Sequence, residues 1–301
     1  MAPGPAPHDE FALLPDNAAE VGLTWRRPTV ERISIDVGGG QQVSALRWGT
    51  DAPEIVLVHG GAQNAHTWDT VALALGRPLV AVDLPGHGHS DWRDDHDYSP
   101  RRNAEALETA LPTLAPDARL VVGMSLGGLS CLALSARAPR IISRLVLVDV
   151  TPGTDRDKAE PVIAFIAGPE RFDSFDDILA RTMEYNPTRT ESSLRRGILH
   201  NAYEDGDGTW VWRYDRTWSH DADSVAEAEG FAGQWGDVDS LTVPTMLVRG
   251  ALSGVVGDED VVEMKRRKPD VRIEVVEGAG HSVQGDKPLE LAGLIESFLD
   301  D

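Results

Sequence analysis

The hydrophobic and polar positions follow a regular rhythm over two parts of the chain, in which short apolar runs alternate with longer amphipathic stretches. Ile55–Val58 is a continuous apolar run, which is typical of a strand buried on both faces. Further strands are predicted at Val30–Asp36, Val43–Trp48, Leu79–Asp83, Arg119–Met124, Arg144–Val148, Pro244–Arg249 and Val271–Val276. Helices are predicted near Thr67–Leu75 and at Pro100–Leu114, Leu126–Ala136, Asp258–Arg267 and Pro288–Leu299. Because strands alternate with helices, the pattern predicts an α/β fold with a mostly parallel central sheet flanked by helices.

The same rhythm divides the chain. It stops at Thr151-Pro152-Gly153, and residues 153–240 are predicted to be a mainly helical insertion. Residues 25–152 and 241–301 then form one core domain. Residues 1–24 precede it, and their Pro- and Ala-rich start, residues 1–8, is expected to be disordered. Residues 9–24 contain too many apolar side chains for a tail, so we expect them to dock on the body or on a second copy in a homo-oligomer.

Charge and composition exclude several classes of partner. The chain has 301 residues, with 28 Lys and Arg against 49 Asp and Glu, a formal net charge of −21. This balance argues against nucleic acid and against an anionic membrane surface, since both attract clustered basic residues. Cys131 is the only cysteine, which excludes an intramolecular disulfide and a cysteine-based zinc site. No apolar run approaches the ~20 residues of a membrane helix, and no signal peptide is recognised, so a cytoplasmic location is expected.

The strongest chemical signal is a G-x-S-x-G motif, Gly123-Met-Ser125-Leu-Gly127. It directly follows the apolar run Leu120-Val-Val122 and directly precedes a predicted helix. Such a strand–turn–helix elbow raises a serine hydroxyl above the edge of the sheet, and its glycines permit the tight turn. Ser125 is therefore the predicted nucleophile.

A serine hydroxyl needs a base, and His281 is the candidate. It lies just past the last predicted strand, so it projects from the carboxyl edge of the sheet, as Ser125 does. His59 and His87 are interpreted as structural, and His66 as a possible substrate contact. The remaining histidines, whose pattern indicates solvent exposure, include His8, His96, His200 and His220. No set of His, Asp and Glu shows a recognisable metal spacing, and no metal site is predicted.

The segment His59-Gly60-Gly61-Ala62 follows the Ile55–Val58 strand. Small residues there let backbone N–H groups approach a developing oxyanion, and the N–H after the nucleophile is the usual second donor. We therefore predict that Gly61 and Leu126 form the oxyanion hole.

These motifs together resemble the α/β-hydrolase superfamily over nearly all of residues 25–301. The matching segments, in family order, are His59-Gly60-Gly61, Asp83-Leu-Pro-Gly-His-Gly-His-Ser90, Gly123-Met-Ser125-Leu-Gly127-Gly128 and Gly278-Ala-Gly-His281. The resemblance implies a serine hydrolase that needs no cofactor. It also implies that residues 153–240 are a cap, or lid, that roofs the active site.

The triad acid departs from the family pattern. The family places an aspartate in the loop after the penultimate strand, where this chain has Gly250-Ala-Leu-Ser253-Gly254. Asp149, at the end of the strand Arg144–Val148, matches an alternative acid position of the superfamily and is the favoured candidate. Two other interpretations stay open: an acid from Asp258, Glu259 or Asp260, which also suit the first turn of a helix, and a dyad or weakened site without an acid.

Aromatic residues gather in the predicted cap, which holds four of the eight tryptophans. A lid rich in aromatic side chains favours a bulky apolar substrate, although most such rings build the core of a small domain. The residues predicted to line a substrate pocket, in addition to His66, are Trp68, Trp92, Met124, Trp210 and Trp218.

We therefore predict a hydrolase of a small-molecule carboxylic ester or lactone, with an aromatic or macrocyclic lactone among the candidates. Hydrolysis of a carbon–carbon bond next to a carbonyl uses the same fold and the same Ser and His. Epoxide hydrolysis and dehalogenation are disfavoured, because those members have an aspartate where this chain has Ser125. A non-catalytic ligand-binding protein is the alternative from another class.

Overall fold

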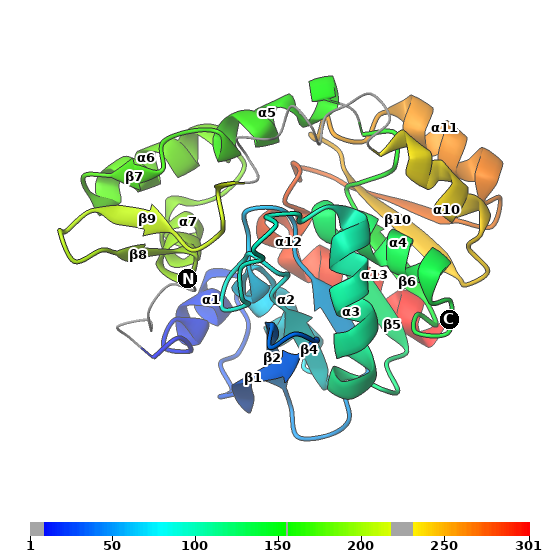
Figure 1. Ribbon diagram of the computed structural model, residues 1–301, viewed down its shortest axis with the longest axis horizontal. Helices are drawn as coiled ribbons and strands as arrows, with labels where there is room; N and C mark the ends of the chain where they lie inside the picture. Colours follow the sequence, from blue (N-terminus) through cyan, green and yellow to red (C-terminus); the bar gives the residue numbers. More distant parts are fainter. Residues whose placement is uncertain (1–8, 155, 218–230) are drawn as a thin grey trace.

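The centre of the molecule is an eight-stranded sheet with the strand order β1-β2-β4-β3-β5-β6-β10-β11 (Figure 1). It is seen in a computed structural model that describes residues 9–154, 156–217 and 231–301. The strands are β1 Val30–Asp36, β2 Gln42–Trp48, β3 Ile55–Val58, β4 Leu79–Val82, β5 Leu120–Met124, β6 Leu145–Val148, β10 Thr245–Gly250 and β11 Arg272–Val276. β2 runs antiparallel to both β1 and β4, and every other neighbouring pair is parallel. The predicted fold class is confirmed.

Strand β3 shows why the sheet needs helices on both faces. All four residues of Ile55–Val58 are fully buried. Ile55 and Leu57 join one apolar cluster, and Val56 and Val58 join another. Side chains alternate between the two faces of a strand, so each cluster fills the space between the sheet and one layer of helices.

The helices divide between these two clusters. Helices α3 (Pro100–Leu114), α4 (Leu126–Arg137) and α11 (Asp258–Arg267) contribute to the first, which contains Val56. Helices α2 (Asp69–Leu75) and α13 (Pro288–Asp300) contribute to the second, which contains Ile55. The predicted helix near Thr67–Leu75 begins as a short 3-10 turn, η1 Ala65–Trp68, before α2. No helix in the described ranges is both long enough and apolar enough to cross a membrane.

The segment before β1 packs on the body of the molecule. Its helix α1 (Leu14–Glu20) buries Leu14 and Ala18, and Leu14 belongs to the cluster under α2 and α13. The expected docking of residues 9–24 is therefore observed within one chain. Residues 1–8, predicted to be disordered, lie outside the described residues.

Most of the chain between β6 and β10 lies to one side of the central sheet, but its last elements pack on the core (Figure 1). Val238 is buried in the cluster that contains Val56, and Gln234 donates to the carbonyl of Leu129 in α4, so the predicted end of the insertion at residue 240 is too late. The described elements between β6 and β10 are α5 Arg156–Ile166, β7 Arg171–Phe172, α6 Phe175–Tyr185, α7 Glu191–Asn201, β8 Ala202–Glu204, β9 Trp210–Trp212, η2 Ala232–Gln234 and α10 Trp235–Asp239. The helices match the mainly helical expectation. The three short strands form an antiparallel sheet in the order β7-β9-β8, which the sequence pattern did not predict.

Candidate active site

Ser125 lies on a strained turn between β5 and α4. Its φ of 50° and ψ of −122° place it in a backbone region that residues other than glycine rarely adopt. The flanking glycines are needed because backbone atoms come very close. A Cβ atom at Gly123 would lie 2.6 Å from the carbonyl oxygen of Gly127, and one at Gly127 would lie 2.4 Å from that of His59. The sequence motif thus forms the elbow that it predicts.

His281 faces the serine hydroxyl. It follows β11 in the loop before the short helix α12 (Val283–Asp286). Its Nε2 atom lies 3.1 Å from Ser125 Oγ, which is a hydrogen-bond distance. The geometry allows the imidazole to take the hydroxyl proton when Nδ1 carries the ring hydrogen.

Asp149 holds the other side of that imidazole. It directly follows β6, its side chain is fully buried, and its Oδ2 atom lies 2.7 Å from His281 Nδ1. The backbone N–H of Gly250 donates to Oδ1 at 3.0 Å, and the hydroxyl of Ser253 donates to Oδ2 at 2.5 Å. Three donors around one carboxylate fix its position beside the imidazole. Sequence reasoning missed Ser253, although it lies in the loop where the acid was sought.

The alternative acids do not contact His281. Asp258 pairs with Arg249, and its side chain is 94% exposed. Glu259 and Asp260 both pair with Lys158, and Asp260 also accepts the N–H of Gly257. All three begin α11, where acidic side chains complement the helix dipole.

The His59-Gly60-Gly61 segment packs against the elbow. A Cβ atom at Gly60 would lie 2.5 Å from Met124 Sδ and 3.1 Å from Ser125 Cβ, so only glycine fits there without displacement. Gly61 lines the cavity in front of Ser125, and Leu126 is the first residue of α4. Leu126 thus directly follows the nucleophile, and Gly61 shares its cavity, which agrees with the predicted oxyanion hole.

Two buried histidines shape this loop. His59 Nε2 accepts the N–H of Leu84 at 2.9 Å, and His87 Nε2 accepts the N–H of Ala62 at 3.1 Å. Burial lowers the pKa of His87 to about 3, with the nearby His59 acting in the same direction. A neutral ring can accept a backbone hydrogen bond, which agrees with the structural role expected for both residues.

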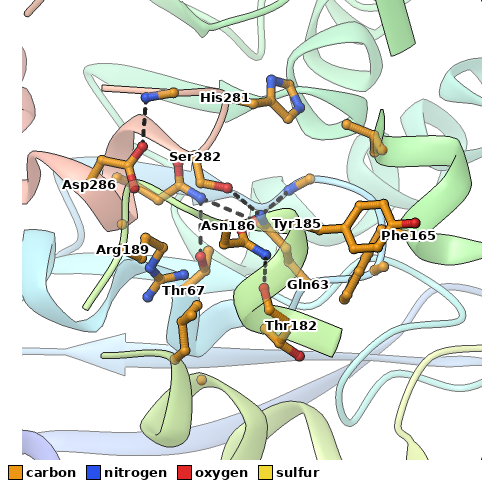
Figure 2. Close-up of a pocket in the computed structure, with 18 of the residues that line it drawn as sticks. Gln63, Thr67, Phe165, Thr182, Tyr185, Asn186, Arg189, His281, Ser282 and Asp286 are labelled. Carbon is orange, nitrogen blue, oxygen red and sulfur yellow. Dashed lines mark hydrogen bonds between the residues drawn. The ribbon is translucent and has the colours of Figure 1, made fainter. Parts of the chain in front are cut away.

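A cavity of about 380 Å³ opens in front of Ser125 and His281. Figure 2 shows His281 and Ser282 on one side of it and Phe165 and Tyr185 on another. Of the predicted pocket residues, His66 and Met124 line this cavity. The lining side chains that sequence reasoning did not assign to the pocket include Gln63, Lys158, Asn186, Arg189, Trp212, Gln284 and Asp286.

The tryptophan predictions need correction. Trp68 is fully buried in the cluster between the sheet and α2, so its apolar ring serves the core rather than the cavity. Trp92 and Trp210 are not among the residues that line the cavity. Trp210 packs edge-on against Phe175, with ring centroids 5.0 Å apart, and so stabilises the inserted elements. Trp218 lies outside the described residues.

His66 belongs to a buried charged network. Its Nδ1 atom lies 2.9 Å from Asp69 Oδ2, and its Nε2 atom lies 3.1 Å from Glu10 Oε2, while Arg32 also pairs with Glu10. The ring of His200 stacks on His66 with centroids 3.8 Å apart, and its side chain is nearly buried. The expectation that His200 is solvated is therefore wrong.

The same cluster contains residue types that bind metal ions in other proteins. Ligand atoms of His66, Asp69 and His200 lie within 4.8 Å of one another. The two imidazole planes are only 11° apart, however, so their in-plane lone pairs do not converge on one point. The Arg32 guanidinium, 3.3 Å from His66 Nε2, adds a positive charge. The arrangement fits an ion-pair network better than a metal centre.

This network predicts a pH-dependent stability. Burial alone would lower the pKa of His66, but the charge of Asp69 and the hydrogen bonds to Asp69 and Glu10 raise it to about 9. Because the folded value exceeds the ordinary 6.5, the stabilisation is complete below pH 6.5 and is lost as the pH rises through 9. The difference corresponds to roughly 3 kcal/mol of unfolding free energy.

We expect His66→Asn to abolish this pH-dependent loss of unfolding free energy. Urea unfolding of both proteins at pH 6 and pH 9.5 measures it. Titrating groups remote from this network are common to both proteins and cancel in the comparison. Parallel pH profiles for the two proteins would contradict the assignment.

Comparison with known proteins defines the class to which this fold and site belong. Residues 55–294 match the model of the alpha/beta hydrolase family. The chain belongs to this family, and the prediction of an enzyme of the hydrolase class is confirmed.

Particular relatives agree with this class. The chain is 47% identical to the esterase Rv0045c of Mycobacterium tuberculosis over 299 residues, which are 97% of this chain and 96% of that protein. A solved structure of that esterase has a TM-score of 0.86 and covers 98% of this chain and all of its own. The structure of an E-2-(acetamidomethylene)succinate hydrolase, 22% identical, has a TM-score of 0.81 over 91% of this chain and all of its own, which shows the shared fold alone.

Proposed function

We propose that the protein is a serine hydrolase that cleaves carboxylic esters through an acyl-enzyme on Ser125. The observation that carries the proposal is the continuous set of contacts from Ser125 Oγ through His281 to Asp149, at 3.1 and 2.7 Å. The activity of the esterase from M. tuberculosis, to which the chain is 47% identical, supports the same reaction class.

The reaction has two halves. His281 Nε2 takes the proton of Ser125 Oγ as the oxygen attacks the ester carbonyl, and the N–H groups of Gly61 and Leu126 stabilise the oxyanion. The imidazolium, held by Asp149, then gives its proton to the leaving alcohol. In the second half His281 activates a water molecule, which releases the acid and restores the serine.

Residues 153–240 act as the cap in this proposal. Phe165, Tyr185 and Trp212 come from this part of the chain and line the cavity in front of Ser125. Their apolar surfaces would hold the acyl or alcohol part of the substrate and exclude water from the acyl-enzyme. A lactone is a cyclic ester and would meet the same groups, so lactones remain within the proposed substrate class.

The non-catalytic alternative rested on the glycine at position 254. The contact of Asp149 with His281 supports the catalytic alternative instead, because the imidazole has a buried carboxylate partner. No observation in the described residues favours carbon–carbon bond hydrolysis over ester hydrolysis.

A fluorophosphonate probe tests the proposal. We expect one covalent adduct, mapped by peptide mass spectrometry to Ser125, together with hydrolysis of p-nitrophenyl butyrate that the probe abolishes. Heat-denatured protein is the matched control and should not be labelled. A folded protein, shown to be so by circular dichroism, that neither reacts with the probe nor hydrolyses the ester would reject the proposed function.

A further inference from the structure

The permanent charges that line the cavity are mainly positive, whereas the chain as a whole is negatively charged. The protein carries a formal net charge of −21. The cavity wall, as far as the structure describes it, is lined by three residues with permanent positive charge, Lys158, Arg189 and Arg196, and by one carboxylate, Asp286. The cavity therefore differs from the acidic surface around it.

Two of these cations have acidic partners. Lys158 pairs with Glu259 and Asp260, and Arg196 pairs with Glu20 of α1. These pairs neutralise the charges and tie the inserted elements to α11 and to α1. Both cations thus have evident structural roles.

Arg189 lacks such a partner. It lies between α6 and α7, and its Nη2 atom donates to Ser193 Oγ at 2.6 Å. Among the described residues this is the only side-chain hydrogen bond of Arg189, and no carboxylate lies within ion-pair distance of its guanidinium. Its Nε atom is buried without a partner. Burial lowers the pKa of Arg189, and the charge of Asp286 acts in the opposite direction, but a guanidinium stays charged.

Within the described ranges, only one oxygen of the Asp286 carboxylate makes hydrogen bonds, and its Oδ1 atom is buried without a partner. Its Oδ2 atom accepts the N–H of Gly280 at 2.7 Å and the hydroxyl of Thr188 at 3.0 Å. Figure 2 labels Asp286 and Arg189 on the same side of the cavity. The Oδ2 contacts fix the backbone beside His281. The Asp286 carboxylate influences Arg189 at a distance, and the guanidinium keeps donors free for another group.

The position of the guanidinium relates it to the catalytic histidine. A Cβ atom at Gly285 would lie 2.8 Å from Arg189 Cζ, so the guanidinium rests on the backbone of α12. Gly285 is four residues after His281. Four residues span at most ~14 Å when extended, and less here because Val283–Asp286 is helical. A substrate of modest length can therefore reach both groups.

We propose that Arg189 binds a carboxylate of the substrate, so that the preferred ester carries a free carboxylate a few carbons from the ester carbonyl. This inference rests on the proposed ester hydrolysis. A carboxylate matches the planar guanidinium with charge-assisted hydrogen bonds, and it would give this buried cation a carboxylate in direct contact, which the described residues do not supply. The neutral apolar walls around Phe165 and Trp212 then hold the connecting carbons.

Matched esters test the inference. p-Nitrophenyl hexanoate and mono-p-nitrophenyl adipate have acyl chains of equal length and differ in the terminal carboxylate. Relative to wild type, Arg189→Met should lower the adipate-to-hexanoate ratio of kcat/KM by about 10- to 100-fold, chiefly through KM. Arg189→Lys keeps the charge and should retain part of the preference.

A second pair places the carboxylate on the other side of the ester. Phenyl hexanoate and 4-carboxyphenyl hexanoate carry the difference in the alcohol part. If Arg189→Met lowers the ratio of kcat/KM for this pair alone, the recognised carboxylate lies on the alcohol side of the ester. If it lowers the adipate-to-hexanoate ratio, the carboxylate lies on the acyl side.

Two further variants complete the design. Arg266→Met removes the same charge from an exposed position on α11 and should leave both ratios unchanged. Gly285→Ala displaces the Arg189 guanidinium without changing any charge, and it should lower the same ratio of kcat/KM as Arg189→Met. The test therefore stays decisive if the Arg189→Met protein does not fold.

Two failures are distinguishable. Ester hydrolysis with both ratios unaffected by Arg189→Met and Gly285→Ala would overturn the role of Arg189 and leave the proposed function intact. Absence of hydrolysis for every ester, together with absence of a fluorophosphonate adduct on Ser125, would overturn both.

Discussion

Replacement of Ser125 by alanine is expected to lower kcat for ester hydrolysis by about 10⁵- to 10⁶-fold. Alanine keeps the elbow backbone and removes the one oxygen that His281 Nε2 contacts at 3.1 Å. No acyl-enzyme can then form, and only binding and oxyanion stabilisation remain to assist direct attack by water. Steady-state hydrolysis of p-nitrophenyl butyrate by the purified variant measures the loss.

The matched control is Ser297→Ala, an exposed serine on α13. It should retain full turnover. Because Ser125 and His281 act as a unit, the double variant Ser125→Ala/His281→Ala should be no slower than Ser125→Ala by more than a few-fold. A Ser125→Ala variant within tenfold of wild type would place the nucleophile elsewhere.

The features that could be predicted from the sequence are those set by local pattern. The continuous apolar run Ile55–Val58 predicts a central strand, and β3 lies between β4 and β5 with all its side chains buried. The glycines around Ser125 predict the elbow because the backbone contacts that require them involve neighbours in sequence or the adjacent strand. Periodicity and glycine spacing carry this information directly.

The sequence narrows the acid of the catalytic triad to a few candidate residues but does not decide between them. Which carboxylate reaches His281 depends on the strand order β6-β10-β11, because this order places the ends of β6 and β11 on either side of the end of β10. Asp149 reaches across that end, where the N–H of Gly250 holds it, and meets His281. A Cβ atom at Gly254 would meet nothing within 4 Å, so the usual acid position is open space.

The pocket and its surroundings depended on contacts between distant residues. His200 looks solvated from its helix position, but the ring of His66 covers it from another part of the chain. Trp68 is a predicted pocket residue, yet its ring fills the core beside α2. Arg189 belongs to no motif, and the absence of a carboxylate in ion-pair contact with it, among the described residues, is visible only in three dimensions. Local patterns hold little information about such contacts.

Asp149→Asn is expected to lower kcat by about 10⁴-fold while the protein remains folded. The amide can still accept the N–H of Gly250 through one oxygen, so the buried site keeps most of its packing. Its NH₂ group, however, presents a hydrogen towards His281 Nδ1, which favours the tautomer with its hydrogen on Nε2. That hydrogen blocks the acceptance of the Ser125 proton, and the later imidazolium loses its charge partner.

Two variants separate this role from a general effect of charge. Asp258→Asn removes a carboxylate that is 94% exposed and that contacts Arg249 rather than His281, so kcat should change by less than about twofold. Ser253→Ala removes one of the three donors to Asp149 and leaves the carboxylate on His281, so a smaller loss of about tenfold is expected. Near-normal turnover in Asp149→Asn would end the assignment of the acid. A comparable loss in Asp258→Asn would instead move it to α11, because no other described contact links that side chain to the reaction.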